Sequence, residues 1–166
     1  MSTIFKRRSI RRYTAQPVTP AQLEMVLKAG MAAPSAENQQ PWQFVVVDHR
    51  EKLDRIPEFH PYSRMLKEAG VAIIVCGDRT LEKIAGFWVQ DCAAAAENML
   101  LMAEELGLGS VWLAVYLLPD RVKALRELLG LPDHITPLAI LPIGYPAEAK
   151  EPIDRFDAWR VHRNHW

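Results

Sequence analysis

The stretch that decides the fold runs from Phe87 to Val115 and reads FWVQDCAAAAENMLLMAEELGLGSVWLAV. Small and apolar residues recur in it at helical spacing and polar residues fall mostly on the other side, which predicts one long amphipathic helix. Its run of alanines lets other backbones come close, so we expect this helix to be central. Gly107 is expected to end the helix, with Leu108 as the accompanying apolar contact. The segment from Ser110 onward is β-branched and aromatic and predicts a short buried strand.

The size and charge of the chain limit its class. With 166 residues it is long enough for one compact domain, so a single domain over residues 1–166 is expected. Lys and Arg together number 20, as do Asp and Glu, and this balance gives no overall attraction to nucleic acid or anionic lipid. No apolar run approaches membrane-spanning length and no apolar signal segment follows the N-terminus, so no membrane partner and a cytoplasmic location are expected.

Several kinds of site are argued against by missing motifs. Cys76 and Cys92 form no close-spaced motif, so reduced core thiols are expected. His162 and His165 lack a surrounding set of carboxylates or cysteines, so no metal site is expected. No G-x-G-x-x-G follows a strand and no G-x-S-x-G occurs, which argues against a Rossmann site, a P-loop and a serine hydrolase.

Other elements are predicted by caps and apolar runs. Residues 19–22, TPAQ, form the capped start of a helix that stops before Pro34. Asp48 is expected to cap a short helix that Pro57 ends. The remaining predictions are strands at residues 43–47, 71–76 and 138–143, and a helix that opens at residues 119–120 and is ended by Gly130.

Three segments are candidates for binding. Residues 6–13, KRRSIRRY, are either a solvated basic arm or, if extended, an anion site that presents Arg7, Ser9 and Arg11 on one side. Residues 34–42, PSAENQQPW, are either a connector or a proline-stiffened loop suited to a flat polar ring edge. The aromatic stretch at residues 58–67 fits a pocket lip or simple packing equally well.

Together these motifs resemble the FMN-dependent nitroreductase family over nearly the whole chain. The resemblance is carried by residues 7–11 (RRSIR), 33–42 (APSAENQQPW), 93–98 with 106–110 (LGLGS), and 143–146 (IGYP). It implies an α+β fold in which a mostly antiparallel sheet is flanked by helices. It also implies a homodimer built on the long central helix, with a C-terminal tail docked on the partner subunit and FMN at the interface.

The resemblance also assigns cofactor contacts. The arm and one arginine of the tail would hold the ribityl phosphate and part of the ring, and the loop after the first long helix would reach the flavin of the partner subunit. The pair at residues 114–115 would lie beside flavin N5, where many relatives have an acidic residue followed by glycine. The lysine and asparagine that some longer relatives place on the pyrimidine ring have no clear match between His60 and Lys67. The full set of contacts is Arg7, Arg8, Ser9, Arg11, Pro34, Ser35, Ala36, Asn38, Ala114, Val115 and Arg155.

The implied activity is hydride transfer from NADH or NADPH through flavin N5 to nitroaromatic or quinone-type acceptors. The chemistry belongs to the cofactor, so no catalytic protein residue is expected. One alternative is a flavoprotein of this fold with reductive dehalogenation or oxygen-dependent chemistry, and another is a flavin-binding protein without turnover. A third is an RNA-binding domain that uses the basic arm, whose affinity would be salt-sensitive.

Overall fold

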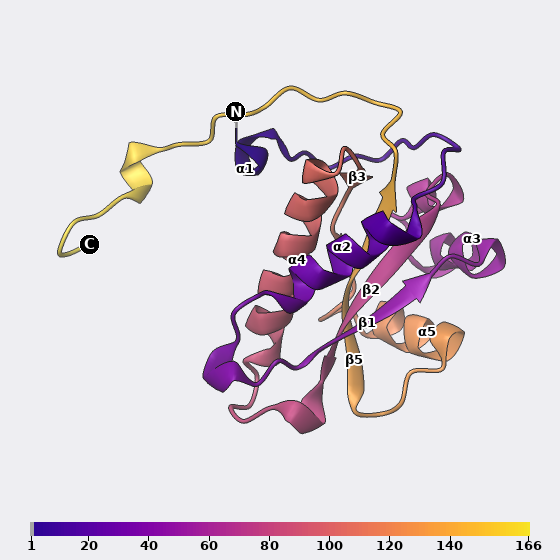
Figure 1. Ribbon diagram of the computed structural model, residues 1–166. Helices are drawn as coiled ribbons and strands as arrows, with labels where there is room; N and C mark the ends of the chain where they lie inside the picture. Colours follow the sequence, from indigo (N-terminus) through magenta and orange to yellow (C-terminus); the bar gives the residue numbers. More distant parts are fainter. Residues whose placement is uncertain (1) are drawn as a thin grey trace.

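An antiparallel sheet forms the frame of the molecule. The computed structural model describes residues 2–166 (Figure 1). Neighbouring strands follow the path β1 (Trp42–Val47), β2 (Val71–Asp78), β5 (Ile135–Gly144) and β3 (Gly109–Ser110), and β4 (Leu113–Ala114) also pairs with β5. All of these pairings are antiparallel. The α+β fold with a mostly antiparallel sheet is therefore confirmed.

Helices cover both faces of this sheet. Helices α2 (Pro20–Met31) and α4 (Trp88–Glu105) pack on one face, and α3 (Arg50–Phe59) and α5 (Pro119–Leu129) on the other. Alternate residues of β2 enter the two cores, which explains why its sequence is continuously apolar. The short helices are α1 (Thr3–Lys6), η1 (Ala36–Asn38), η2 (Arg64–Lys67), η3 (Arg79–Leu81) and η4 (Ala158–Arg160).

Helix α4 is central, as its sequence predicts. It contacts α2 and all of the main strands from one side of the sheet. Its end is a Schellman turn: Gly107 has a φ of 72°, its N–H donates to Glu104 O at 3.0 Å, and the N–H of Leu108 donates to Ala103 O at 2.8 Å. The predicted capping box of α2 is also present, with Thr19 and Gln22 bonded to each other.

Two predicted elements differ from the structure, and each contains or faces a proline. Helix α3 has His49 rather than Asp48 at its N-cap, and Pro57 lies inside it. The buried side chains of Leu53 and Ile56 hold this helix on the sheet, so it continues past the proline to Phe59. The strand expected at residues 110–115 is split into β3 and β4, which share one register on β5. The gap falls opposite Pro142, which has no N–H for the ladder.

The C-terminal tail runs beside the basic arm from Ala147 to Glu151, where backbone and side-chain hydrogen bonds join the two segments, and leaves the body of the chain beyond that point (Figure 1). Phe156, Trp159 and Trp166 are 79%, 90% and 96% exposed. Within one chain these aromatic side chains are uncovered, so the docking of the tail on a partner subunit stays a prediction. No helix within residues 2–166 combines the length and the apolar character needed to span a membrane.

Candidate functional site

A cavity of about 650 Å³ lies where β4 meets the start of α5. Its walls come from segments far apart in sequence: the basic arm, the aromatic stretch, β4 and α5. Two of the predicted contact residues line it, Arg11 and Ala114. The full lining is Arg11, His60, Pro61, Tyr62, Arg64, Met65, Trp112, Leu113, Ala114, Leu118 and Arg121.

The backbone of Ala114 is turned away from the sheet. The N–H of Val115 donates to Leu138 O on β5 at 3.1 Å. Since backbone groups of successive residues alternate sides along a strand, the N–H and C=O of Ala114 point away from β5. The carbonyl oxygen of Ala114 accepts a hydrogen bond from Arg121 Nη1 at 3.0 Å and lies 3.0 Å from His60 Nε2. Its amide N–H is therefore directed to the same edge, where the cavity lies.

His60 is held as a neutral ring behind this carbonyl. It is only 1% exposed, and its Nε2 must carry the proton that Ala114 O accepts. Burial lowers the pKa of His60, and the positive charge of Arg121 acts in the same direction. Its Nδ1 has no hydrogen-bond partner within residues 2–166.

Three arginines give the cavity its charge: Arg11, Arg64 and Arg121. No carboxylate residue is among the lining residues, and none of the three guanidinium groups forms an ion pair with any residue that the structure describes. The Cζ of Arg121 lies 5.6 Å from the ring centroid of Tyr62, a cation–π contact at the cavity edge. The aromatic stretch is thus a pocket lip at Tyr62 and core packing at Met65.

The arm divides its side chains among different partners. Arg7 pairs with Glu97 of α4 at 3.3 Å, whereas Arg11 lines the cavity. The guanidinium of Arg8 donates to the backbone oxygens of Phe5, Arg7 and Glu151. Ser9 forms a parallel bridge with Ser110, and its carbonyl accepts from Lys150 Nζ at 2.6 Å.

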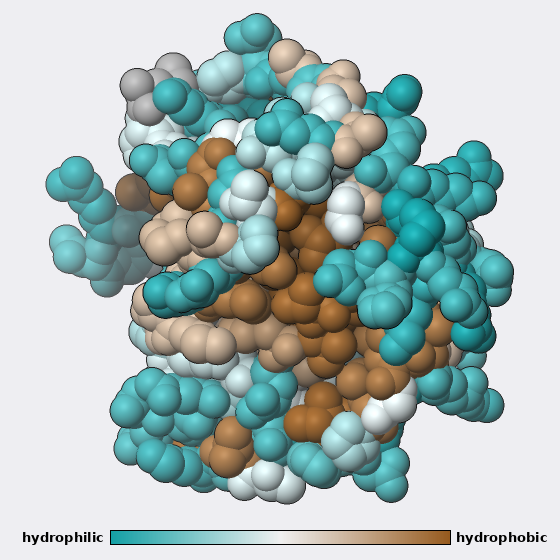
Figure 2. Space-filling view, turned by 45° about the vertical axis from the view of Figure 1, so that its right-hand side comes forward, coloured by the Kyte–Doolittle hydropathy of each residue, from teal (hydrophilic) through white to brown (hydrophobic). Residues whose placement is uncertain are grey.

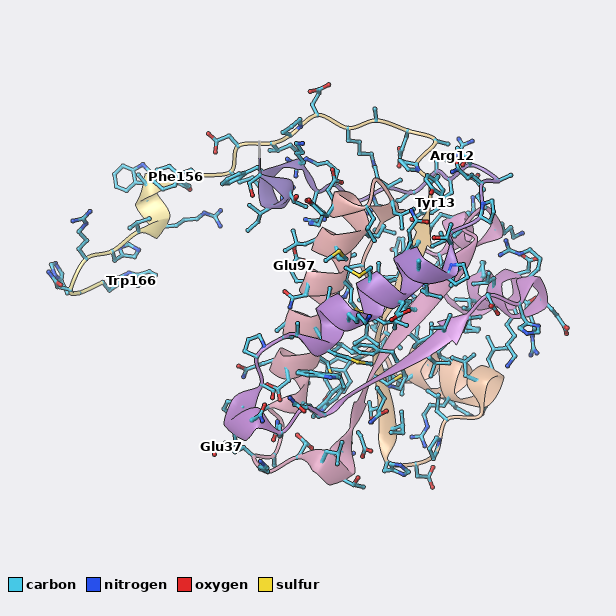
Figure 3. All side chains as sticks on the ribbon, viewed as in Figure 1. Arg12, Tyr13, Glu37, Glu97, Phe156 and Trp166 are labelled. Atoms are coloured by element: carbon cyan, nitrogen blue, oxygen red, sulfur yellow. The ribbon has the colours of Figure 1, made fainter. Side chains whose placement is uncertain are left out.

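The loop at residues 34–41 lies at a different end of the molecule from the arm, as the labels of Glu37 and Arg12 show (Figure 3). Three of its residues other than glycine have positive φ: Glu37 and Asn38 at 49° and Gln40 at 47°. Such conformations cost free energy and persist only where surrounding contacts impose them. In this loop Ser35 Oγ accepts from the N–H of Gln40 at 3.0 Å.

Asp91 of α4 supplies the main contacts that hold this loop. Its Oδ1 accepts the N–H of Ala36 at 2.9 Å, and its Oδ2 accepts from Gln39 Nε2 at 2.6 Å. Gln39 in turn accepts the backbone N–H of Lys83 at 2.8 Å. Asp91 is only 4% exposed and has no cationic partner among residues 2–166, so a buried charge is stabilised by hydrogen bonds alone.

The predicted contact residues therefore do not all meet within one chain. Arg11 and Ala114 share the cavity, Val115 is buried behind it, and Pro34, Ser35, Ala36 and Asn38 lie at the other end. Arg155 lies in the exposed tail, next to Phe156 (Figure 3). The sequence prediction missed His60, Arg64 and Arg121. The polar and aromatic composition of residues 58–67 was the only signal for the first two.

The described residues, 2–166, contain no cluster of potential metal ligands. Among residues 2–166 there is no group of three or more His, Cys, Asp or Glu side chains that could hold a metal ion. Cys76 and Cys92 are free and buried, and burial raises the pKa of the Cys76 thiol to about 12.

Comparison with known proteins identifies the family. The family model described as the nitroreductase family matches residues 4–69 and 57–145. A protein of Methanothermobacter thermautotrophicus with the provisional name NADH dehydrogenase/NAD(P)H nitroreductase is 50% identical over 100% of this chain and 87% of its own length. An FMN-dependent nitroreductase from Clostridium difficile has a TM-score of 0.92 and 33% identity, covering 99% of both chains.

A second solved structure links the same fold to a bound cofactor. A protein from Desulfovibrio desulfuricans, provisionally named a nitroreductase and solved in complex with FMN, has a TM-score of 0.85 and 31% identity over 99% of this chain and 95% of its own. The family match covers the arm, the loop, α4 and the whole sheet, so the similarity is not confined to one motif. The chain belongs to the nitroreductase family.

Proposed function

We propose that this protein binds FMN in the cavity beside Ala114 and passes hydride from NADH or NADPH to nitroaromatic or quinone-type acceptors. As a member of its family it is an NAD(P)H-dependent flavin oxidoreductase. The acceptor class, the contact residues, the dimer, a cytoplasmic location and a single domain over residues 1–166 are the further parts of the proposal.

The observation that carries the proposal is that a backbone N–H without a partner in the sheet and two arginine side chains lie at the same cavity. The N–H of Ala114 points away from β5 at the edge of the cavity that Arg11 and Arg64 line. A flat heteroaromatic ring has a nitrogen acceptor for this amide and carbonyl oxygens for the guanidinium groups. The volume of about 650 Å³ is in the range of cofactor sites. The donors present therefore fit a flavin ring.

When bound, FMN supplies an N5 atom that accepts hydride from the nicotinamide and then gives it to the acceptor. The N–H of Ala114 would orient the ring by a hydrogen bond at that atom. Arg11 and Arg64 would stabilise negative charge on the pyrimidine edge, because fixed cations act strongly on charge that develops in a partly desolvated site. No side chain is needed as nucleophile. The apolar Ala114 and Val115 replace the acidic residue and glycine of many relatives, so only the backbone acts here.

We place the ribityl phosphate on the arm and the tail. Arg7 and Ser9 remain the proposed phosphate contacts of the arm, Arg155 of the tail adds a third, and Arg11 reaches from the arm to the ring. The guanidinium of Arg8 is occupied by three backbone oxygens, so we assign Arg8 a backbone contact and a role in holding the arm. Arginine forks suit phosphate because they donate two parallel, charge-assisted bonds.

A homodimer is the second part of the proposal. The loop at residues 34–38 and the cavity lie apart in one chain, so both can contact one flavin only if the loop comes from a partner subunit. Apolar residues gather in the middle of one face, surrounded by hydrophilic residues (Figure 2). Met25 and Met31 of α2 and Phe87, the N-cap residue of α4, are exposed. Uncovered apolar surface of this kind favours association.

The first experiment is the visible spectrum of the purified protein before and after anaerobic addition of NADH or NADPH. Flavin bands near ~450 nm that bleach on addition are expected from bound, reducible FMN. A colourless protein that takes up no added FMN would overturn the proposal.

A second experiment tests the proposed arginine contacts to FMN, Arg11 on the ring and Arg155 on the phosphate. Replacing Arg11 and Arg155 together by alanine should release FMN on gel filtration while the far-UV circular dichroism stays unchanged. The matched control is the double replacement of Arg12 and Arg160, which removes the same charge from the same two segments. Equal FMN retention in the two double variants would refute the assignment.

A further inference from the structure

We propose that the cavity beside Ala114 selects electron acceptors that carry a carboxylate, and that Arg121 is the side chain that binds it. This inference rests on the proposed function, because it concerns the acceptor of the same site. It goes beyond that function by naming a chemical class of acceptor and a residue that none of the sequence motifs includes.

The first observation is local charge in a neutral protein. The chain has 20 basic and 20 acidic residues, yet the cavity is lined by three arginines and by no carboxylate. Outside the cavity, half of the arginines in residues 2–166 pair with an acid; those that do are Arg7, Arg12, Arg50, Arg126 and Arg160. A cavity that concentrates uncompensated cations attracts anionic ligands.

The second observation separates Arg121 from the other two arginines. Arg121 Nη1 donates to the carbonyl oxygen of Ala114 at 3.0 Å, so its guanidinium is fixed next to the residue proposed to face N5. Arg11 and Arg64 are already assigned to the ring. An acceptor that receives hydride beside Ala114 therefore lies within reach of Arg121.

The third observation is the set of donors that Arg121 keeps free. A guanidinium has five N–H groups. Only Nη1 has a hydrogen-bond acceptor among the residues that the structure describes, while Nε and Nη2 have none. The ring of Tyr62, 5.6 Å from Cζ, limits where the group can move. A planar fork held at one end with donors to spare suits bidentate binding of a carboxylate.

His60 completes the arrangement without competing for the ligand. Its Nε2 lies 3.0 Å from the same carbonyl oxygen, so the histidine and Arg121 fix Ala114 from two sides. The ring is buried and neutral, as described above, so the charge available to an anion in this corner is that of Arg121.

The test uses two nearly isosteric acceptors, 4-nitrobenzoate and 4-nitrobenzamide, with the FMN-loaded protein. Dissociation constants are measured without electron donor, from the change in the flavin absorbance of the oxidised protein. The wild type should bind the carboxylate about tenfold more tightly or better, as expected for a charge-assisted hydrogen bond. Arg121→Gln should reduce this preference to about threefold or less, and Arg121→Lys should keep part of it, since lysine keeps the charge but loses the fork.

The matched control is Arg126→Gln on the same helix. Arg126 pairs with Asp133 and does not line the cavity, so the preference should be that of the wild type. The ratio of kcat/KM for the two acceptors should follow the ratio of dissociation constants in every variant. Because each variant is compared with itself, a general loss of activity does not alter the ratio.

Three results would overturn the inference. One is equal affinity of the wild type for the two compounds, and another is an unchanged preference in Arg121→Gln. The third is a raised KM for NADPH in Arg121→Gln with an unchanged acceptor ratio, which would mean that the arginine binds the phosphates of the donor. Reduction of both acceptors with equal constants refutes this inference alone, whereas a protein that binds no FMN and reduces neither refutes the proposed function as well.

Discussion

Replacing Asp91 should release the loop at residues 34–41 from the strained conformation that the structure shows. In Asp91→Ala the N–H of Ala36 and the amide of Gln39 lose their acceptors, which lie at 2.9 Å and 2.6 Å. Hydrogen bonds to a charged group contribute about 1.5–3 kcal/mol each, so the two together set an upper range of about 3–6 kcal/mol.

Part of this loss should be recovered when the loop relaxes. Positive φ at a residue other than glycine costs of order 1–3 kcal/mol, and Glu37, Asn38 and Gln40 all have it. We therefore expect Asp91→Ala to lower the free energy of unfolding by about 3 kcal/mol. In Asp91→Asn the side-chain oxygen can still accept one of the two hydrogen bonds, but the NH2 group faces the other donor. We therefore expect the free energy of unfolding to fall by about 2 kcal/mol.

The assay is urea unfolding followed by tryptophan fluorescence, together with FMN affinity measured by flavin fluorescence. Asp91→Asn should weaken FMN binding as well as stability, because Ser35 and Asn38 are proposed to contact the flavin of the partner subunit. The control is Gln90→Ala, the exposed neighbour on the same helix, which should leave both quantities unchanged. Wild-type stability in Asp91→Ala, or lost stability with unchanged FMN affinity, would refute the reasoning.

Three more predictions concern the core, pH and the tail. Gly77→Ala should cost about 3 kcal/mol in urea unfolding, because a Cβ there overlaps the ring of Trp88, whereas Gly70→Ala, with open space at its Cβ, should change stability by less than about 0.5 kcal/mol. Burial lowers the pKa of His60, so the unfolded chain binds a proton at this residue before the folded chain does. The free energy of unfolding should therefore fall as the pH drops below about 6.5. His60→Gln should remove this part of the pH dependence and leave the loss at lower pH that carboxylates cause. Removal of residues 152–166 should shift sedimentation toward the monomer, and an unchanged profile would contradict docking of the tail on a partner.

Local sequence patterns determined the main helices and the ends of two of them, α2 and α4. The capping box at Thr19 and Gln22 and the Schellman turn at Gly107 depend on residues within one or two turns of each other, so they can be read from spacing. The continuous apolar run of β2 likewise predicted a strand buried on both faces. The family motifs added the order of elements and two residues, Arg11 and Ala114, that the structure brings to one cavity.

Strand boundaries depended on partners that are distant in sequence. The strand expected over residues 110–115 is interrupted where Pro142 lies opposite Val111, and Pro142 is placed there only by the register of β5. Helix α3 continues beyond Pro57 because Leu53 and Ile56 are buried in the core against strand residues. In both cases tertiary packing outweighs a local rule: that a proline ends a helix, and that a continuous apolar run forms one strand.

The chemistry of the site depends on tertiary contacts between residues that are distant in sequence. His60 and Ala114 are separated by 54 positions in sequence, Asp91 and Ala36 by 55, and each pair is joined by a single hydrogen bond. No periodicity relates residues so far apart, because their distance is fixed by the packing of helices on a common sheet. The sequence by itself determined the main helices, the capping box of α2, the Schellman turn of α4 and the family, and only the fold placed Arg121 beside Ala114 and turned a backbone amide toward a cationic cavity.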